Sequence, residues 1–241
     1  GETGCCSPVT TSQPGIFACG SFTGPKDIPD SVMEGSAAAA SAARTLATAR
    51  GTLQKEITFP FETDVSADPP RVGVFICHCG KNIGGVADVP SLVESVRDVP
   101  NVAYVQDNLF SCSQDSQNQM VQMIQEHHLN RVMVAACSPT THAAMFQTML
   151  RNAGLNKYLF EMANIRNQCT WVHQGEPGKA TEKCLDLIRM AVAKARLLEP
   201  LKYLSEPVNK RTKVIGGGMS GITSALALAD QGFEVHLVER T

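Results

Sequence analysis

The clearest pattern along the chain is a series of short apolar runs, each of the length found in strands buried in a parallel sheet. These runs cover residues 72–77, 102–105, 132–136 and 158–162. Between and after them, apolar residues recur at helical spacing. The helical stretches cover residues 92–96, 117–127, 142–151 and 181–198. Because strands that alternate with helices predict right-handed βαβ units, we expect residues 71–200 to form a complete α/β domain with a Rossmann-like parallel sheet.

The residues before this domain have the pattern of a partial domain. A short apolar run at Ile16–Cys19 predicts one strand, and an alanine-rich helix is expected from Pro29 to Ala49, with Asp30 or Ser31 as its N-cap. One strand and one helix cannot bury a core. We therefore interpret residues 1–56 as the end of a preceding domain, joined to the central domain by a proline-punctuated linker at 57–70.

The residues after the central domain have the pattern of a domain that begins. After a second linker at 201–211, the pattern predicts a strand, a glycine-rich turn, a helix and another strand, at residues 213–215, 216–221, 222–231 and 233–239. Together these elements make one βαβ unit, and we interpret residues 212–241 as the start of a further domain. The chain is expected to be a fragment, with one complete domain between pieces of two others.

The composition fits a globular protein and excludes several classes. The 241 residues are 43% hydrophobic and 18% charged, and the formal net charge of −2 gives no electrostatic case for binding nucleic acid or an anionic membrane. Residues 36–49, the longest weakly apolar run, contain Arg44 and are too short to cross a bilayer. No secretion signal opens the sequence, so we expect a cytoplasmic location. In that reducing compartment, the nine cysteines are read first as metal or redox ligands.

Most of the cysteines follow predicted strands of the central domain. The candidates for a metal site are Cys77, Cys79, Cys112, Cys137 and Cys169. Because the carboxyl ends of parallel strands open on the same edge of a sheet, thiolates from several strands can meet there. Cys5, Cys6, Cys19 and Cys184 are interpreted as ordinary cysteines, with Cys184 on the apolar face of the last helix.

A hydroxyl residue comes directly after three of these cysteines, at Ser113, Ser138 and Thr170. Serine and threonine are common helix N-caps, and Pro139 suits the first position of a helix. A cysteine before such a cap faces unpaired N–H groups and the positive end of a helix dipole. We therefore expect the thiolate form to be favoured at these positions.

Several kinds of site are compatible with this pattern. An iron–sulfur cluster needs about four thiolates with N–H donors nearby, and it fits best. Structural zinc prefers C-x-x-C pairs, whereas the nearest pair here is Cys77 and Cys79. A thiol/disulfide relay at these two residues and inert packing are the other readings. Five candidates exceed four ligands, and we take Cys77 as the spare. Arg166 and Lys81 either balance the charge of a cluster or are ordinary solvated residues.

The glycine-rich turn has the spacing of a dinucleotide-binding fingerprint. Gly216, Gly218 and Gly221 lie between a predicted strand and a helix, and a second strand ends at Glu239. The glycines allow a tight turn and let a pyrophosphate approach the helix N-terminus, while the carboxylate can accept hydrogen bonds from ribose hydroxyls. The pattern does not distinguish FAD from NAD.

Five segments of the chain resemble the N-terminal domain of the heterodisulfide reductase A-subunit, and the resemblance continues into the flavin fingerprint. The segments are Val72–Ile83, Cys112–Asp115, Val134–Pro139, Tyr158–Arg166 and Lys183–Pro200. The resemblance implies a [4Fe-4S] cluster next to a thioredoxin-reductase-like FAD domain, in an oxidoreductase subunit that passes electrons by flavin-based bifurcation. It implies other subunits of such a complex and ferredoxin or hydrogenase-type electron donors as partners. The alternative is a non-catalytic docking domain that uses its cysteines for zinc or for packing.

Residues 15–31 resemble the opposite end of such a flavin domain. In its closing motif, a glycine turn and the next helix N-terminus approach the flavin ring, which implies Gly20, Asp27 and Ile28 as cofactor-binding residues. Related flavoproteins have aspartate where Ser21 stands here. The order of segments resembles the junction of two tandem modules.

Overall fold

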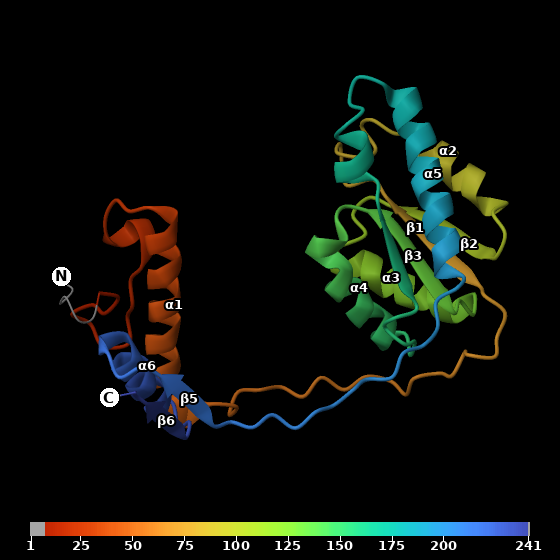
Figure 1. Ribbon diagram of the computed structural model, residues 1–241. Coiled ribbons are helices and arrows are strands. Elements are labelled where there is room, and N and C mark those ends of the chain that lie inside the picture. The colour runs from red at the N-terminus through yellow and green to blue at the C-terminus, as the bar shows by residue number, and fades with distance from the viewer. Residues whose placement is uncertain (1–7, 241) are drawn as a thin grey trace. The chain divides into compact units, whose positions relative to one another are not determined.

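The structure is a computed structural model that describes residues 8–240. The chain forms two compact units (Figure 1). One unit runs from Ile57 to Leu204, and the other combines the N-terminal segment up to Glu56 with the C-terminal segment from Ser205 onward.

The central unit is built on a four-stranded parallel sheet, which confirms the predicted α/β class. Its strands are β1 (Val72–Cys77), β2 (Val102–Asn108), β3 (Arg131–Ala136) and β4 (Phe160–Asn164), in the order β2-β1-β3-β4. Every residue of β1 and β3 is buried, whereas β2 lies at an edge and is only partly buried. The first strand, β1, therefore lies in the middle of the sheet. The next strand, β2, pairs with one side of β1, and β3 pairs with its other side.

Two pairs of helices cover the two faces of the sheet (Figure 1). Helices α2 (Val89–Arg97) and α5 (Pro177–Ala195) pack together on one face, and α3 (Gln114–Glu126) and α4 (Pro139–Asn152) pack together on the other. A single turn of π-helix, η3 (Arg166–Thr170), joins β4 to the segment before α5. This three-layer arrangement gives the unit two hydrophobic cores, one on each face of the sheet.

The element boundaries differ from the sequence pattern by a few residues for local reasons. Helices α3 and α4 each begin three residues early, because their first turns are polar and start at the N-caps Ser113 and Ser138. Strand β4 begins two residues late, because the Tyr158 amide donates a hydrogen bond to Asn156 Oδ1 in a turn. The hydrophobic pattern locates each element but does not include its capping residues.

The segment expected to be a free linker, residues 57–70, packs against the central unit. The Thr63 amide donates to the Gly154 carbonyl at 2.9 Å, and the Val65 side chain is buried. The guanidinium of Arg151 lies 3.5 Å from the centre of the Phe59 ring. These contacts place the segment in the compact unit that starts at residue 57.

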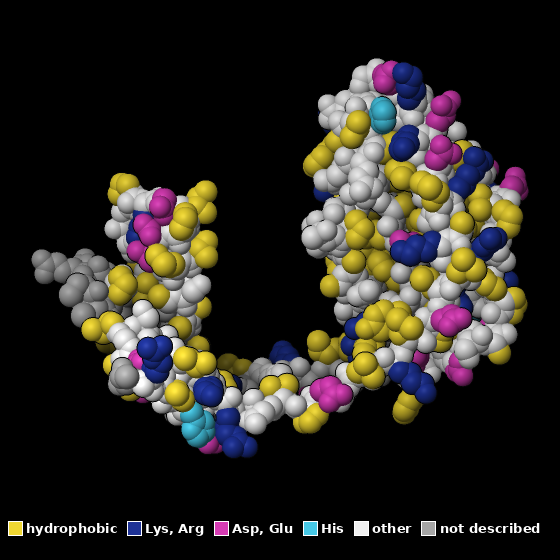
Figure 2. Space-filling model, viewed as in Figure 1, with side chains coloured by type: hydrophobic (Ala, Val, Ile, Leu, Met, Phe, Trp, Pro, Cys, Tyr) yellow, Lys and Arg dark blue, Asp and Glu magenta, His cyan; other side chains and the backbone are white. Residues whose placement is uncertain are grey.

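The other unit has little core. It contains η1 (Gly20–Thr23), α1 (Ile28–Thr45), η2 (Ala47–Ala49), β5 (Thr212–Ile215), α6 (Met219–Ala229) and β6 (Val235–Val238). Strands β5 and β6 form a two-stranded parallel sheet, and α6 packs against both strands and against α1. Figure 2 shows hydrophobic side chains along the outside of α1, where Ile28, Val32 and Met33 are exposed.

Two expectations for the N-terminal segment were wrong. Residues 16–19 form no strand, because Phe17 makes only one isolated β-bridge, to Thr10. Helix α1 begins at Ile28 rather than Pro29, since the Asp27 carboxylate caps it by accepting from the Asp30 amide. It ends at Thr45 rather than Ala49, and a short 3₁₀ turn follows.

Candidate functional site

Two of the predicted cysteines lie where the strand order of the central sheet reverses. Cys77 is the last residue of β1, and Cys137 comes directly after β3, the neighbouring strand. Connections from these two strands lead to opposite sides of the sheet, and ligands of α/β proteins bind at the carboxyl ends of strands at such a point. Cys77 Sγ accepts hydrogen bonds from the backbone N–H groups of Cys79 and Ser111, both at 3.3 Å.

Two more cysteines approach the same point from neighbouring loops. Cys79 lies in the loop after β1 with a left-handed backbone, φ 46°, and its sulfur accepts a hydrogen bond from Arg166 Nη1 at 3.3 Å. Cys112 follows β2 and is exposed. The ionisation of the Cys112 and Cys137 thiols is influenced by Cys77, Cys79 and Arg166 in both cases. Four thiols and one guanidinium therefore share one neighbourhood.

The helix caps do not favour the thiolate form as the sequence suggested. Surrounding atoms desolvate the Cys112 and Cys137 sulfurs, although the Cys112 residue as a whole is exposed, and this raises the pKa of both thiols. The nearby Cys77 and Cys79 raise it further, while Arg166 lowers it. Loss of solvation thus has the largest effect on these two thiols. Ser113 does cap α3 through the Ser116 amide, but the Ser138 side chain makes no capping bond. A bound cation would be needed to hold these thiols ionised.

The fifth candidate, Cys169, is not part of this group. It lies in η3, fully buried, with its sulfur 3.4 Å from that of Cys184 in α5. Its thiol also donates to the Ala180 carbonyl at 3.2 Å. Burial raises the pKa of both thiols. The structure thus pairs Cys169 with Cys184 in the core between the sheet and α5, and it places Cys77, our expected spare, among the other three cysteines.

The residues around the four thiols have the chemistry that an iron–sulfur cluster requires. Within residues 8–240, no three His, Cys, Asp or Glu side chains stand close enough to hold a metal ion without moving. However, N–H groups already point at cysteine sulfurs, and the two buried polar side-chain atoms without a partner in the described residues, Asn108 Nδ2 and Ser111 Oγ, lie just before Cys112. Spare donors beside clustered thiols fit a cluster, whose sulfurs accept hydrogen bonds.

The loop with Cys79 is fastened to η3 by residues that the sequence did not reveal. The Thr170 hydroxyl donates to the Asn82 carbonyl at 2.8 Å, and Trp171 Nε1 donates to Asn82 Oδ1 at 3.2 Å. The Asn82 amide and side chain both donate to the Cys79 carbonyl. No spacing rule links residues so distant in the chain, so only the fold shows this connection.

The glycine-rich turn has the close backbone contacts expected of a nucleotide-binding loop. Gly216 has φ +108°, and a Cβ on Gly221 would lie 1.8 Å from the Gly216 carbonyl oxygen. Gly218 is the N-cap of α6. The Glu239 carboxylate accepts from the Gly217 amide at 2.5 Å, so it lies beside the turn. The structure brings these predicted residues together.

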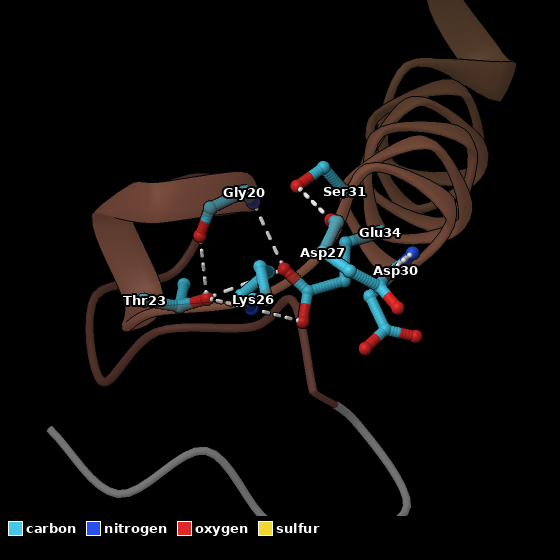
Figure 3. Close-up of polar contacts among 7 residues, drawn as sticks. All are labelled: Gly20, Thr23, Lys26, Asp27, Asp30, Ser31 and Glu34. Carbon is cyan, nitrogen blue, oxygen red and sulfur yellow. Dashed lines mark hydrogen bonds and ion pairs between the residues drawn. The ribbon is translucent and has the colours of Figure 1, made fainter.

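A carboxylate that the sequence did not single out organises the N-terminal turn (Figure 3). Glu34 of α1 accepts hydrogen bonds from the Gly20 amide at 2.9 Å and the Thr23 hydroxyl at 3.2 Å, and it pairs with the Lys26 ammonium. The hydrogen bond with Lys26 holds the pKa of Glu34 below its usual value. Gly20 has φ +67°, which favours glycine.

The other two predicted residues of this motif lie at the N-terminus of α1. Asp27 is its N-cap and Ile28 its first residue (Figure 3 shows the cap). The Ile28 side chain is 80% exposed. Gly20 and Asp27 are thus tied to the same helix, which matches the predicted arrangement of a glycine turn followed by a helix N-terminus.

Cys5 and Cys6 lie outside the described residues. Among the residues that are described, no helix has the length and apolar character needed to cross a membrane.

Comparison with known proteins gives a family match for one segment and several relatives of the chain. Residues 214–241 match the family described as NAD(P)-binding Rossmann-like domain. The chain is 52% identical over 176 residues to the iron-sulfur A-subunit 2 of CoB–CoM heterodisulfide reductase from Methanopyrus kandleri, which covers 73% of this chain and 27% of that protein.

Two other relatives give the same result. The chain is 49% identical over 176 residues to a protein of Archaeoglobus profundus described as similar to the heterodisulfide reductase A-subunit, with 73% of this chain and 25% of that protein covered. It is 50% identical over 173 residues to the A-subunit of the H₂:CoB-CoM heterodisulfide, ferredoxin reductase of Methanothermobacter thermautotrophicus, with 72% and 26% covered. The chain spans about a quarter of the length of these relatives, and it belongs to the family of heterodisulfide reductase A-subunits.

Proposed function

We propose that this chain is the part of a heterodisulfide-reductase-like electron-transfer subunit that holds a [4Fe-4S] cluster on Cys77, Cys79, Cys112 and Cys137. The observation that carries the proposal is that Cys77 and Cys137 end neighbouring strands at the reversal point of the parallel sheet. Cys79 and Cys112 lie in the loops beside them, and the charges of Cys77 and Cys79 act on the Cys112 and Cys137 thiols. A bound cluster supplies storage for one electron at a time. The relative from Methanopyrus kandleri is named as an iron-sulfur protein, which supports the same chemistry.

The protein contributes a rigid support and hydrogen-bond donors to this site. Cys77 and Cys137 are buried at the ends of fully buried strands, so their positions are fixed by the sheet. Cys79 and Cys112 lie in loops and can adjust to a ligand. The amides of Cys79 and Ser111 already donate to the Cys77 sulfur. Such N–H donors stabilise negative charge on cluster sulfurs.

The proposed ligand set leaves Cys169 as the spare cysteine in place of Cys77. Its sulfur lies against Cys184 in the core on the α5 side of the sheet. Moving this thiol to the edge would require η3 to unwind and would empty a packed position. We therefore assign Cys169 and Cys184 to packing.

We further propose that FAD contacts the glycine-rich turn and the closing motif. The support is the close packing of Gly216 and Gly221, the position of Glu239 beside the turn, and the tie between the Gly20 turn and α1. The turn would receive the pyrophosphate and Glu239 the ribose hydroxyls. Asp27 and Ile28 would present the N-terminus of α1 to the flavin.

The names of two relatives include redox partners. One is named for H₂ and ferredoxin, and another is a ferredoxin/F420H₂-dependent enzyme of Methanosarcina acetivorans. We propose that this chain works in the cytoplasm with other subunits of such a complex and exchanges electrons with a ferredoxin or a hydrogenase-type donor.

Anaerobic reconstitution of the whole chain with iron and sulfide tests the cluster. We expect about four irons per chain, broad visible absorption and an EPR signal after reduction. Serine substitutions of Cys77, Cys79, Cys112 and Cys137, one at a time, should each lower the iron content. The matched control is Cys169→Ala, which should retain full iron.

Three results would contradict the proposal. If reconstituted wild-type protein contains no iron, the chain does not bind a cluster. If it contains zinc instead, the docking-domain alternative is favoured. Iron loss in Cys169→Ala, with retention in Cys77→Ser and an unchanged circular dichroism spectrum in both, would restore the ligand set that the sequence first suggested.

A further inference from the structure

Arg166 is the cationic side chain that contacts the group of four thiols. It is the first residue of η3, and its Nη1 donates a hydrogen bond to Cys79 Sγ at 3.3 Å. Its charge also acts on the thiols of Cys112 and Cys137. The guanidinium of Arg166 therefore interacts electrostatically with cysteines that follow three different strands, Cys79, Cys112 and Cys137.

No carboxylate of residues 8–240 forms an ion pair with Arg166. Its other contacts are neutral, because Nε donates to Asn167 Oδ1 at 3.3 Å and the guanidinium lies 4.8 Å from the centre of the Trp171 ring. A partly buried cation without a counter-ion interacts more strongly with any negative charge that arrives beside it.

The surroundings of Arg166 hold the guanidinium in place. The Arg166 carbonyl accepts from the Trp171 amide at 2.9 Å, which closes the π-helical turn. Trp171 in turn donates to Asn82, whose amide donates to the Cys79 carbonyl. The aromatic ring under the guanidinium and the loop with the Cys79 sulfur are thus fastened to each other. Lys81, the other cation considered near this edge, is exposed and makes no such contact in the described structure.

We propose that Arg166 sets the reduction potential of the cluster by keeping a fixed positive charge against the Cys79 ligand. This inference rests on the proposed function, since it assumes that a cluster binds the four cysteines. When the cluster accepts one electron from a reductant, its net charge becomes more negative by one. A fixed cation stabilises this reduced form more than the oxidised form, so it raises the potential.

Redox titration of the reconstituted whole chain tests the role of Arg166. The potential is measured by EPR with mediator dyes in wild type, Arg166→Gln, Arg166→Lys and the control Lys81→Gln, after iron content and circular dichroism have been compared. In Arg166→Gln we expect the equilibrium constant for one-electron reduction to fall about tenfold, which is about 59 mV. Arg166→Lys keeps the charge but loses the planar fork, so its potential should lie between those of wild type and Arg166→Gln. Lys81→Gln should match wild type.

The outcomes separate this inference from the proposed function. Wild-type protein that binds no iron would overturn both. A cluster that forms normally, with the same potential in Arg166→Gln as in wild type, would overturn only the role of Arg166, and so would an equal shift in Lys81→Gln. If Arg166→Gln takes up no iron, the test rests on Arg166→Lys. A cluster in Arg166→Lys with the same reduction potential as in wild type would contradict the role of the Arg166–Cys79 contact.

Discussion

The central unit (Ile57–Leu204) and the terminal unit, which combines the segments up to Glu56 and from Ser205 onward, contain similar Rossmann-type patterns but differ in how much apolar surface they bury. All buried hydrophobic side chains in the described residues belong to residues 57–204, with the single exception of Val9. In the terminal unit, α6 has no buried residue, and Met219 and Ile215 are 81% exposed. Both units thus contain helices and strands, but only the central unit has a hydrophobic core that stabilises these elements.

This difference bears on the two proposed cofactors. The cysteines are attached to a sheet covered on both faces, so the cluster site is supported before any cofactor binds. The glycine turn lies on a two-stranded sheet with one helix, and two strands alone are marginally stable in water. We therefore expect the cluster site to be rigid and the flavin site to depend on further contacts.

Hydrogen exchange on the whole chain should show the largest contrast. Amides of β1 and β3 are expected to exchange only through global unfolding, which costs on the order of 5–15 kcal/mol, whereas amides of β5 and α6 should open at a small fraction of that cost. Mass spectrometry of peptic peptides measures both. A polypeptide of residues 57–204 alone should keep the slow exchange of β1 and β3.

Equally slow amide exchange in β3 and β5 would contradict the difference between the two units, because it would mean that the terminal unit has a core of its own. Loss of protection in the excised central unit would show that its stability depends on the terminal segments.

Much of the fold was predictable because the central strands are buried on both faces. The runs at β1 and β3 contain no polar side chain apart from Arg131, and Ser113 and Pro139 mark the starts of the helices before and after β3. The start of α1 at Ile28 was missed by one residue, and its N-cap was expected at Asp30 or Ser31 rather than at Asp27, because several residues nearby could serve as caps. Local chemistry settles which elements form, while the choice among neighbouring caps depends on the final geometry.

The sequence predicted where the cysteine site lies, but it did not predict correctly which cysteines belong to it. Cys77 ends β1, Cys137 directly follows β3 and Cys112 lies in the loop after β2, so the sheet topology places them at one edge. Cys169 also follows a strand in sequence, but the π-helical turn between them directs it into the core. A turn closed by bonds five residues apart has no sequence signature comparable to a cap or a glycine, so this change of direction could not be read from the pattern.

A pair of leucine substitutions gives a contrast of intermediate size. Leu150 in α4 is fully buried, and Leu150→Ala should lower the free energy of unfolding of the central unit by about 2–5 kcal/mol. Leu226 in α6 is 60% exposed, and Leu226→Ala should change the same quantity by less than about 0.5 kcal/mol. Urea denaturation followed by circular dichroism measures both. A large loss in Leu226→Ala would show that the terminal unit stabilises the central one.

The smallest expected effect concerns the pH dependence of the N-terminal turn. Because the pKa of Glu34 is lower in the folded turn than in the unfolded chain, the folded turn gains stability above the unfolded pKa and loses it as the pH falls through the folded one. The Gly20 amide, which donates to this carboxylate, should therefore lose its hydrogen-bonded chemical shift in acid, below the ordinary range for glutamate. NMR titration of the whole chain follows this signal. In Glu34→Gln the acid transition should vanish, while Glu56→Gln, which changes an exposed carboxylate of the same unit, should leave it in place. An acid transition that persists in Glu34→Gln would mean that another group controls the turn and that the contacts of Glu34 with Gly20, Thr23 and Lys26 do not hold it.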